Sequence, residues 1–297
     1  MPELPEVETI RLGLQKYLVG HRIEKVDVRL PKIFQGDVKN IEGGKIISVR
    51  RFGKGLVIDL ENKNSIAIHI KLTGQLIYRG PNLKQKVILS KKAGDSLPSS
   101  RTHVIFELDK GGFLYYNDLR QFGWIKIVKT DEVFDLPFFK RLGPELLPSS
   151  GQAPLTLQMF KKIIHSSKLS IKPFLMDQKK IGGIGNIYAN DGLFDAEIDP
   201  RRRAGTLSEE EIKKLYSSLL KVLKAGFKYK GASELNFVNV LGEEGDYQKH
   251  FLVYSREGQK CKRSGRRSKS SARQDDHIIK KIKLGGRGTY YCERCQK

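Results

Sequence analysis

The spacing of apolar residues divides the chain into regions of different character. Over residues 6–19, apolar residues recur every three or four positions, which predicts an amphipathic helix. From about residue 45 to residue 129, short β-branched and aromatic runs alternate with Gly and Asn, a pattern typical of antiparallel strands in a two-layer sandwich. The helical pattern returns after residue 154, so the sequence predicts an α+β multidomain fold.

The helical region is followed by a tail of different composition. The pattern predicts helices over 155–166, 173–179, 186–194 and 208–228. Ser208 lies three residues before Glu211, which is the spacing of a capping box at the start of the last helix. Further along, "HFLVYSREG" (250–258) predicts a strand, and "GRRSKSSARQDD" (265–276) is so poor in apolar residues that we expect a mobile insertion.

These patterns set the expected domain boundaries. We expect a catalytic β-sandwich domain over 1–136, a linker over 137–154, a helical domain over 155–250 and a C-terminal segment over 251–297. Within the sandwich, residues 84–101 are expected to form a polar loop between two strands. The C-terminal segment contains all three cysteines of the chain.

Charge adds the first indication of a partner. Lys and Arg number 55 against 33 Asp and Glu, which gives a net charge of +22 and favours a polyanionic partner such as DNA, RNA or an anionic membrane surface. The sequence has no apolar run of membrane-spanning length, and because its first residues lack the cationic start and the apolar stretch of a signal peptide, we expect none. Three cysteines are too few for a disulfide scaffold, so we expect a cytoplasmic, reducing setting.

The amino terminus, "MPELPEVE", is acidic although the chain is basic. A small residue at position 2 favours removal of Met1, which would expose the amine of Pro2. An α-amine has a pKa of about 7.7–8.0, so a useful fraction is unprotonated at neutral pH and can form a Schiff base with an aldehydic carbon. Glu3 can act as a general acid, Glu6 can orient the site, and Glu8 is expected on the helix surface. By composition alone, the same residues also suit an ordinary helix N-terminus.

The octapeptide "PELPEVET" resembles the start of the formamidopyrimidine-DNA glycosylase (Fpg, or MutM) family of base-excision enzymes. The resemblance continues along nearly the whole chain. Its further segments are "RRFGKGLVIDL" (50–60), "HIKLTG" (69–74), "DLRQFG" (118–123), "IKPFLMDQKKIGGIGNIYANDGLF" (171–194) and "GGRGTYYCERCQK" (285–297). It implies that the helical domain is a helix-two-turns-helix DNA-binding domain and that the C-terminal segment forms a zinc-finger-like β-hairpin.

The resemblance implies a bifunctional DNA glycosylase/AP lyase that excises oxidised purines, such as 8-oxoguanine and formamidopyrimidines, in base-excision repair. Pro2 would form the Schiff base and Glu3 would assist base release, followed by β- and δ-elimination. Lys54 would contact the lesion or a phosphate and assist proton transfer. Arg287 would bind the phosphates at the lesion and assist the second elimination. The expected partner is double-stranded DNA with oxidised bases or abasic sites, bound by a monomer associated with the nucleoid.

An enzyme that acts on a base must take it out of the stack, and inserted side chains offset the lost stacking. By resemblance, Leu72 stands where the family usually has a wedge Met, and Arg120 and Phe122 are the other wedge residues. Ordinary strand packing and a surface cation are the alternatives for these residues. The other expected DNA contacts are Arg101, His103, Lys168, Lys172 and Asn186. His103 suits a structural role equally well, and the match at Lys168 is weakened by the neighbouring Ser167.

The zinc signature of the family is altered in this chain. Cys292 and Cys295 form an intact C-x₂-C pair, but Cys261 is followed by Ser264 at the second ligand position, and the spacer is longer than usual. His277, within the spacer, could complete a Cys₃His zinc site. A weaker site with water as fourth ligand, and a hairpin held by packing without zinc, remain open alternatives.

Two other functions compete with the purine glycosylase. A pyrimidine-directed enzyme of the endonuclease VIII type is one, although "PELPE" argues against it because that group has Gly in place of Leu4. A non-catalytic damage-binding protein is the other, but it would be expected to lack Pro2, Glu3 or Lys54. Residues 232–250 are expected to hold a loop that caps the lesion.

Overall fold

The computed structural model describes residues 1–81, 83, 88–149, 151–264 and 277–297. The expected insertion at 265–276 and part of the expected polar loop, 84–87, therefore lie outside the described residues. The chain forms two compact units. The first comprises Met1–Leu142, Pro148–Gln152 and Gly226–Gln248, and the second comprises Gly143–Leu147, Ala153–Ala225 and Lys249–Lys297. Residues 226–248, which the sequence pattern grouped with the helical domain, thus belong to the unit that contains the sandwich.

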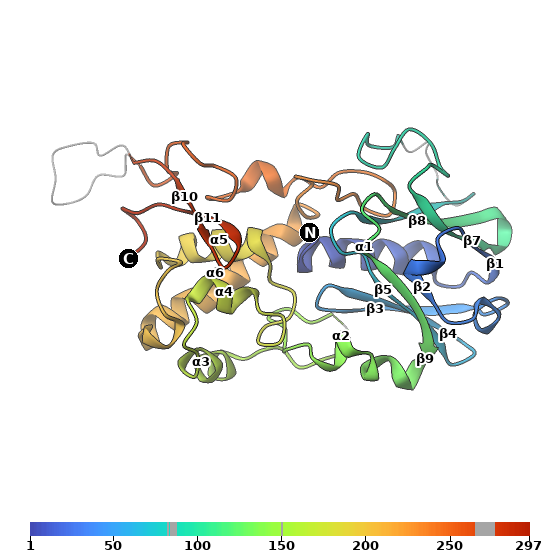
Figure 1. The fold of residues 1–297 in the computed structure, drawn as a ribbon, viewed down its shortest axis with the longest axis horizontal. Coiled ribbons are helices and arrows are strands. Elements are labelled where there is room, and N and C mark those ends of the chain that lie inside the picture. The colour runs from blue at the N-terminus through green and yellow to red at the C-terminus, as the bar shows by residue number, and fades with distance from the viewer. Residues whose placement is uncertain (82, 84–87, 150, 265–276) are drawn as a thin grey trace. The chain divides into compact units, whose positions relative to one another are not determined.

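β-Sheets build the first unit (Figure 1). In the described part of this unit, one sheet has the order β1-β7-β8-β6 with antiparallel neighbours, and the other has the order β2-β9-β5-β4-β3 with a short parallel β2–β9 pair. The strands are β1 (Ile23–Val28), β2 (Phe34–Gln35), β3 (Ile46–Phe52), β4 (Gly55–Leu60), β5 (Asn64–His69), β6 (Gly74–Arg79), β7 (Thr102–Leu108), β8 (Gly112–Asp118) and β9 (Trp124–Lys129). The expected antiparallel β-sandwich is confirmed.

The expected N-terminal helix is α1 (Leu4–Leu18), and it supplies part of the core of the first unit. Its apolar residues Val7, Ile10, Leu14 and Leu18 are buried in one cluster with strand residues of both sheets. Burial of one apolar face, rather than local helix propensity, supplies most of the stability of a helix of this kind. A short helix α2 (Pro137–Lys140) follows the last strand of the sandwich.

The second unit is mainly helical. It contains α3 (Leu157–His165), α4 (Ile171–Met176), α5 (Asn186–Ala196), most of α6 (Glu209–Lys228) and the hairpin of β10 (Lys280–Leu284) and β11 (Arg287–Tyr291). Each expected helix is present with its ends shifted by a few residues. The capping box is confirmed, because Ser208 N donates to Glu211 Oε2 at 2.8 Å and Glu211 N donates to Ser208 Oγ at 3.2 Å. Across the ranges described above, none of the helices is both long and apolar enough to cross a bilayer.

The strand expected over 250–258 is wrong. This segment is irregular, and a carboxylate takes the place of a neighbouring strand. The backbone N–H groups of Leu252, Val253 and Tyr254 donate to the carboxylate of Asp191 in α5 at 3.0, 3.0 and 3.1 Å. Two of the apolar side chains that suggested a strand, Leu252 and Val253, instead pack in a cluster with Phe194 and the cysteines of the C-terminal segment.

Candidate active site and metal cluster

Glu6 organises the start of helix α1. One of its oxygens, Oε2, accepts a hydrogen bond from Glu3 N at 2.8 Å, and the other, Oε1, accepts one from Ala232 N at 2.8 Å. The side chain is 1% exposed. Gly231 approaches it so closely that a Cβ there would lie 2.8 Å from Glu6 Cγ, and its φ of +83° also favours glycine. Glu6 therefore joins the N-terminus to the turn at 231–232.

The terminal amine lies among carboxylates and a lysine. The structure includes Met1, and burial lowers the pKa of its amine, although Glu3, Glu6 and Glu234 act in the opposite direction. Lys54 contributes to the lowering of this pKa through its positive charge. A lower pKa leaves more of the amine unprotonated and nucleophilic at neutral pH. Removal of Met1 would move the amine one residue along, to Pro2, which is buried.

Lys54 lies in the tight turn between β3 and β4. Phe52 pairs with Gly55, so Gly53 and Lys54 form a two-residue hairpin turn, and the φ of +57° at Gly53 suits the first position of a type II′ turn. The Lys54 side chain is buried, and so is that of Glu3. The structure thus brings Glu3, Glu6 and Lys54 within electrostatic range of one terminal amine.

The buried Arg51 stabilises this turn through a hydrogen bond to its backbone. Its guanidinium is fully buried and donates to Gly53 O at 3.0 Å and to Glu8 Oε2 at 2.8 Å. The expectation that Glu8 lies on the helix surface is wrong, because its carboxylate is the counter-charge that a buried arginine requires. Burial opposes ionisation of Glu8, but hydrogen bonds from Arg11 and Arg51 outweigh it and lower the pKa of Glu8.

Hydrogen bonds of Thr73 connect the two loops that carry the expected wedge residues. Thr73 Oγ1 donates to the carboxylate of Asp118 and accepts a hydrogen bond from Arg120 N at 3.0 Å. Leu72 is partly exposed, and Phe122 is 54% exposed. The guanidinium of Arg120 lies 4.7 Å from the centre of the Phe122 ring. Leu72, Arg120 and Phe122 therefore lie on two neighbouring loops, as a shared wedge requires.

His69 was missed by the sequence analysis. Its Nδ1 accepts a hydrogen bond from Lys71 N at 3.0 Å, and Lys71 has a φ of +50°, which is unusual for a residue other than glycine. Burial, aided by the charges of Lys71 and Lys54, lowers the pKa of His69 to about 3. The neutral imidazole thus holds the turn that precedes Leu72. The sequence signal for this role is slight, because a histidine in a strand can have many other functions.

His103 and Arg101 lie beside the same loops. His103 is buried, and its Nε2 donates to Asp118 O at 2.9 Å, which favours the structural alternative for this residue. Arg101 is partly exposed, and its carbonyl accepts a hydrogen bond from Asp118 N at 3.0 Å.

The remaining expected contacts lie in the second unit. Asn186 is the first residue of α5, and Lys168 is exposed after the buried Ser167. Lys172, in contrast, is fully buried, and its ammonium donates to Gly288 O at 2.9 Å and Thr289 Oγ1 at 2.7 Å. Lys172 therefore holds the hairpin, and a phosphate contact through its ammonium would require the side chain to move.

Arg287 opens strand β11 directly after the hairpin turn. Gly285 and Gly286 form this turn with φ values of +56° and +74°, a conformation that favours glycine at both positions. The Arg287 side chain is exposed. It is therefore accessible to a phosphate backbone.

Three cysteines and one histidine meet in the C-terminal segment. The ligand atoms of Cys261, His277, Cys292 and Cys295 all lie within 4.8 Å of one another. The distances are 3.8 Å between the sulfurs of Cys261 and Cys295, 3.8 Å between Cys295 Sγ and His277 Nδ1, and 2.9 Å between Cys292 Sγ and His277 Nδ1. A tetrahedral zinc ion with ligands at about 2.0–2.3 Å separates its ligand atoms by about 3.4–3.8 Å, so the cluster fits zinc after a small adjustment.

Ser264 has a supporting position at this cluster. Its Oγ accepts a hydrogen bond from His277 N at 3.3 Å. The serine at the usual cysteine position therefore contacts the backbone of the histidine that could complete the metal site. Of the three open alternatives for this site, the geometry favours Cys₃His.

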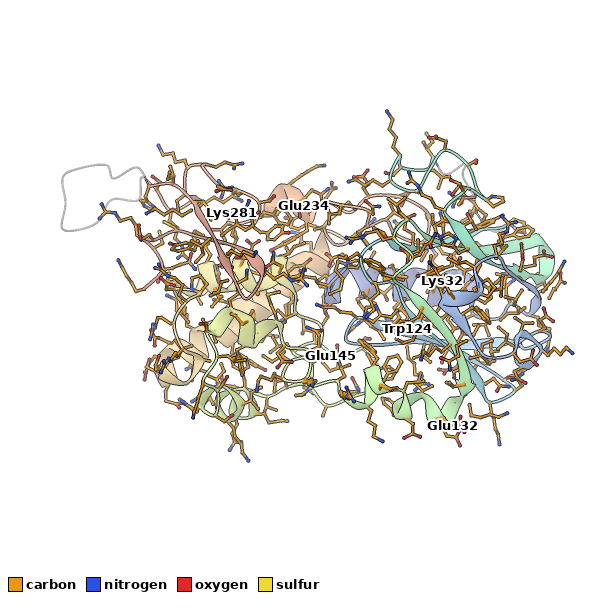
Figure 2. All side chains as sticks on the ribbon, viewed as in Figure 1. Lys32, Trp124, Glu132, Glu145, Glu234 and Lys281 are labelled. Atoms are coloured by element: carbon orange, nitrogen blue, oxygen red, sulfur yellow. The ribbon has the colours of Figure 1, made fainter. Side chains whose placement is uncertain are left out.

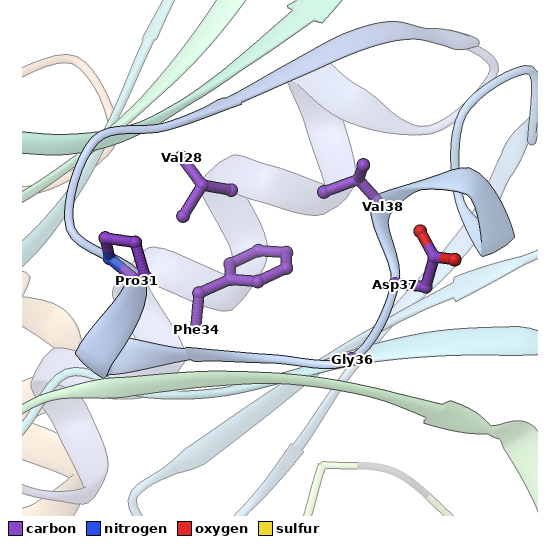
Figure 3. Close-up of a pocket in the computed structure, with 6 residues that line it drawn as sticks. All are labelled: Val28, Pro31, Phe34, Gly36, Asp37 and Val38. Carbon is purple, nitrogen blue, oxygen red and sulfur yellow. The ribbon is translucent and has the colours of Figure 1, made fainter.

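An apolar pocket on the first unit is separate from these groups. Figure 3 shows Val28, Pro31, Phe34 and Val38 facing one another, while the carboxylate of Asp37 points away from them. None of the expected catalytic or DNA-contact residues lines this pocket.

Comparison with known proteins places the chain in a family. Its residues 1–125 match the formamidopyrimidine-DNA glycosylase N-terminal domain, residues 142–237 match the H2TH domain of the same enzymes, and residues 276–297 match a zinc finger found in FPG and IleRS. The expected helix-two-turns-helix and zinc-finger segments are thus confirmed. Zinc is accordingly the metal that the Cys₃His cluster is suited to hold.

Relatives match the chain over its full length. The formamidopyrimidine-DNA glycosylase of Pelotomaculum thermopropionicum is 40% identical over 100% of this chain and 99% of its own, and that of Desulfitobacterium hafniense is 36% identical over 100% of both. The solved structure of Lactococcus lactis Fpg (MutM) with DNA containing an oxidised pyrimidine has a TM-score of 0.82 and 29% identity over 100% of both chains. A structure of MutM with DNA containing carbocyclic 8-oxo-G gives the same three values. The chain therefore belongs to the formamidopyrimidine-DNA glycosylase family.

Proposed function

We propose that this protein is a bifunctional DNA glycosylase/AP lyase that excises oxidised purines, such as 8-oxoguanine and formamidopyrimidines, in base-excision repair. Family membership supports the glycosylase activity on damaged DNA. The observation that supports the mechanism is the N-terminus, where Glu3, Glu6 and Lys54 lie within electrostatic range of the Met1 amine next to Pro2, and burial lowers the pKa of that amine. The substrate is double-stranded DNA with an oxidised base or an abasic site, bound by one copy of the protein.

The first step is nucleophilic. After removal of Met1, the Pro2 amine attacks C1′ of the extruded nucleotide, and the bond between C1′ and the base breaks with its electron pair leaving on the base. The proton that the amine loses is transferred to the departing base. Glu3 donates a proton toward the sugar oxygen, the ring opens, and a Schiff base forms between Pro2 and C1′. Glu6 accepts the N–H of Glu3 and so fixes the carboxylic acid beside the amine. It acts as a positioning residue.

The second stage cleaves the strand. The positive charge of the Schiff base makes the C2′ proton acidic, and its loss expels the phosphate on the 3′ side. A second elimination then expels the phosphate on the 5′ side. Lys54, beside the amine, assists proton transfer, and the exposed Arg287 holds the phosphates as they leave.

DNA binding combines a wedge with phosphate contacts. Leu72 and Phe122 enter the gap left by the extruded base, and Arg120 hydrogen-bonds the base that has lost its partner. Lys168, Asn186 and Arg101 contact phosphates, whereas His103 and Lys172 hold loops in place. Cys261, His277, Cys292 and Cys295 would hold zinc, which would stabilise the hairpin. Because the substrate is chromosomal DNA, we also propose a cytoplasmic location at the nucleoid.

Base release from defined duplexes tests this function. The protein, with removal of Met1 verified by mass, is incubated with duplexes that contain 8-oxoguanine, an oxidised pyrimidine or undamaged guanine. We expect release of 8-oxoguanine and strand cleavage on both sides of the lesion. Faster excision of the pyrimidine would support the endonuclease VIII type, a comparison worth making because a similar protein was solved with oxidised-pyrimidine DNA. Binding without cleavage of any duplex would support the non-catalytic alternative.

A further inference from the structure

The segment from Gly231 to Gly245 starts beside Glu6, the residue that also contacts Glu3 at the N-terminus. Ala232 N donates to Glu6 Oε1 at 2.8 Å, and the charge of Glu234, which is labelled in Figure 2, affects the pKa of the terminal amine. The next residue, Leu235, is 58% exposed although it is apolar. Residues 234–236, which we term the tip, thus form a bend with an exposed side chain at its centre, and they closely follow the contact between Ala232 and Glu6, which also accepts the N–H of Glu3.

Strand β6 holds one side of this segment. Tyr78 N donates to Val240 O at 2.7 Å, and Gln75 Nε2 donates to Asn236 O at 2.7 Å. Val238 is buried against Ile77 of the same strand. The base of the tip is closed by Ser233, whose Oγ donates to Phe237 O at 2.8 Å and accepts a hydrogen bond from Gly245 N at 2.9 Å.

Residues 88–93, from the loop between β6 and β7, hold the other side. The ammonium of Lys92 donates to Ser233 O and to Glu244 Oε2, the latter at 2.7 Å, so one side chain contacts both ends of the segment. Ser90 contacts the same region, because its Oγ donates to Glu244 Oε1 at 2.6 Å and its N donates to Gly242 O at 2.9 Å. The backbone of Lys92 is itself fixed, since Gln75 Nε2 donates to Lys92 O at 2.9 Å.

We propose that Lys92, supported by Ser90, is a positioning residue that fixes the tip at 234–236 beside the catalytic amine and thereby promotes excision of a damaged base. Lys92 has this role because it ties Ser233, where the tip begins, to Glu244, where the segment turns back. In this proposal, the ordered tip covers the base of an extruded nucleotide that still carries it. An abasic nucleotide presents no base, so its cleavage depends much less on Lys92. This inference rests on the proposed glycosylase/lyase function.

The test compares two substrates in single-turnover reactions of the full chain. Lys92→Met removes the ammonium but keeps an unbranched side chain, and Lys91→Met is the matched control because Lys91 is the exposed neighbour with the same charge. We expect Lys92→Met to excise 8-oxoguanine about three- to tenfold more slowly, the range expected for losing the net contribution of its hydrogen bonds to Ser233 and Glu244. Cleavage of an abasic duplex should be unchanged. Lys92→Arg, which keeps the donor and the charge, should restore most of the excision rate.

Two results would overturn the role of Lys92. One is a Lys92→Met protein that matches Lys91→Met on both substrates, and the other is an equal loss on both substrates, which indicates general destabilisation. Hydrogen exchange at residues 233–244 gives an independent readout and should be faster in Lys92→Met than in Lys91→Met. Equal exchange in the two variants also contradicts the inference. Failure of the wild-type protein on both substrates would instead refute the proposed function, and exchange alone would then decide the role of Lys92.

Discussion

Protonation of His69 is expected to destabilise the first unit below neutral pH. The imidazole is 4% exposed and accepts the N–H of Lys71 through Nδ1. A proton on Nδ1 would remove this acceptor and place a charge beside Lys54 and Lys71, which already lower the pKa of His69. The turn that holds Leu72 would lose its support at the same time.

The magnitude follows from the two pKa values. The pKa of His69 is about 3 in the folded protein, against roughly 6.5 for an unfolded histidine. At pH values between these two pKa values, the unfolded chain binds more protons at His69 than the folded protein does. The contribution of His69 to stability is therefore complete above the pKa of the unfolded state. It is lost as the pH falls toward the pKa of the folded state. Lowering the pH from 8 to 5 should therefore cost about 2 kcal/mol of unfolding free energy through this residue alone.

Urea unfolding of wild-type protein and His69→Asn at pH 8 and pH 5 measures this cost. Asn keeps an acceptor for Lys71 N but does not titrate. The fluorescence of Trp124, the single tryptophan of the chain, reports on the correct unit, because its ring centre lies 5.8 Å from that of His69. We expect the wild-type protein to lose about 2 kcal/mol more than the variant between the two pH values. An identical pH dependence in both proteins would refute the reasoning.

Three further predictions concern buried contacts. Arg51→Met removes the fully buried partner of the Glu8 carboxylate and should lower the unfolding free energy in urea by about 3–5 kcal/mol. Arg11→Met removes the more exposed partner and should cost about 1 kcal/mol or less. Lys172→Met removes the donor to Gly288 O and Thr289 and should speed hydrogen exchange at residues 287–291. Lys168→Met, at an exposed position, should leave this exchange unchanged. Equal exchange in the two variants would contradict the role of Lys172 in holding the hairpin. His277→Ala should lower the zinc content of purified protein measured by mass spectrometry, and zinc equal to that of wild type would rule out the Cys₃His site.

The features that the sequence predicted depend on local patterns. Helix α1 was predictable because its apolar residues recur with the period of a helix and are buried together. The capping box at Ser208 and Glu211 was predictable because its two partners are three residues apart. The clustering of Cys261, His277, Cys292 and Cys295 was predictable as one of three alternatives because cysteine and histidine have few roles in that spacing, although the hydrogen bond of Ser264 was not.

The missed features depend on residues that are distant in sequence. The pair of Glu8 and Arg51 spans 43 positions, and no periodicity distinguishes its carboxylate from one on a helix surface. The hairpin contact of Lys172 could not be predicted either, because Thr289, which accepts a hydrogen bond from its ammonium, is 117 residues away. The strand expected over 250–258 failed for the same reason, because Asp191 takes the backbone N–H groups that a sheet would need. Tertiary hydrogen bonds of this kind override local preference.

Borohydride trapping on an abasic duplex tests the catalytic amine most directly. Protein whose loss of Met1 is verified by intact mass should form a covalent complex with the DNA, and peptide mapping should place the link on Pro2. Pro2→Gly should still trap, because glycine also supplies a terminal amine. The same protein with a retained N-terminal extension should form no complex. Equal trapping with the blocked terminus, or a link that maps to Lys54, would contradict the proposal that the terminal amine is the nucleophile.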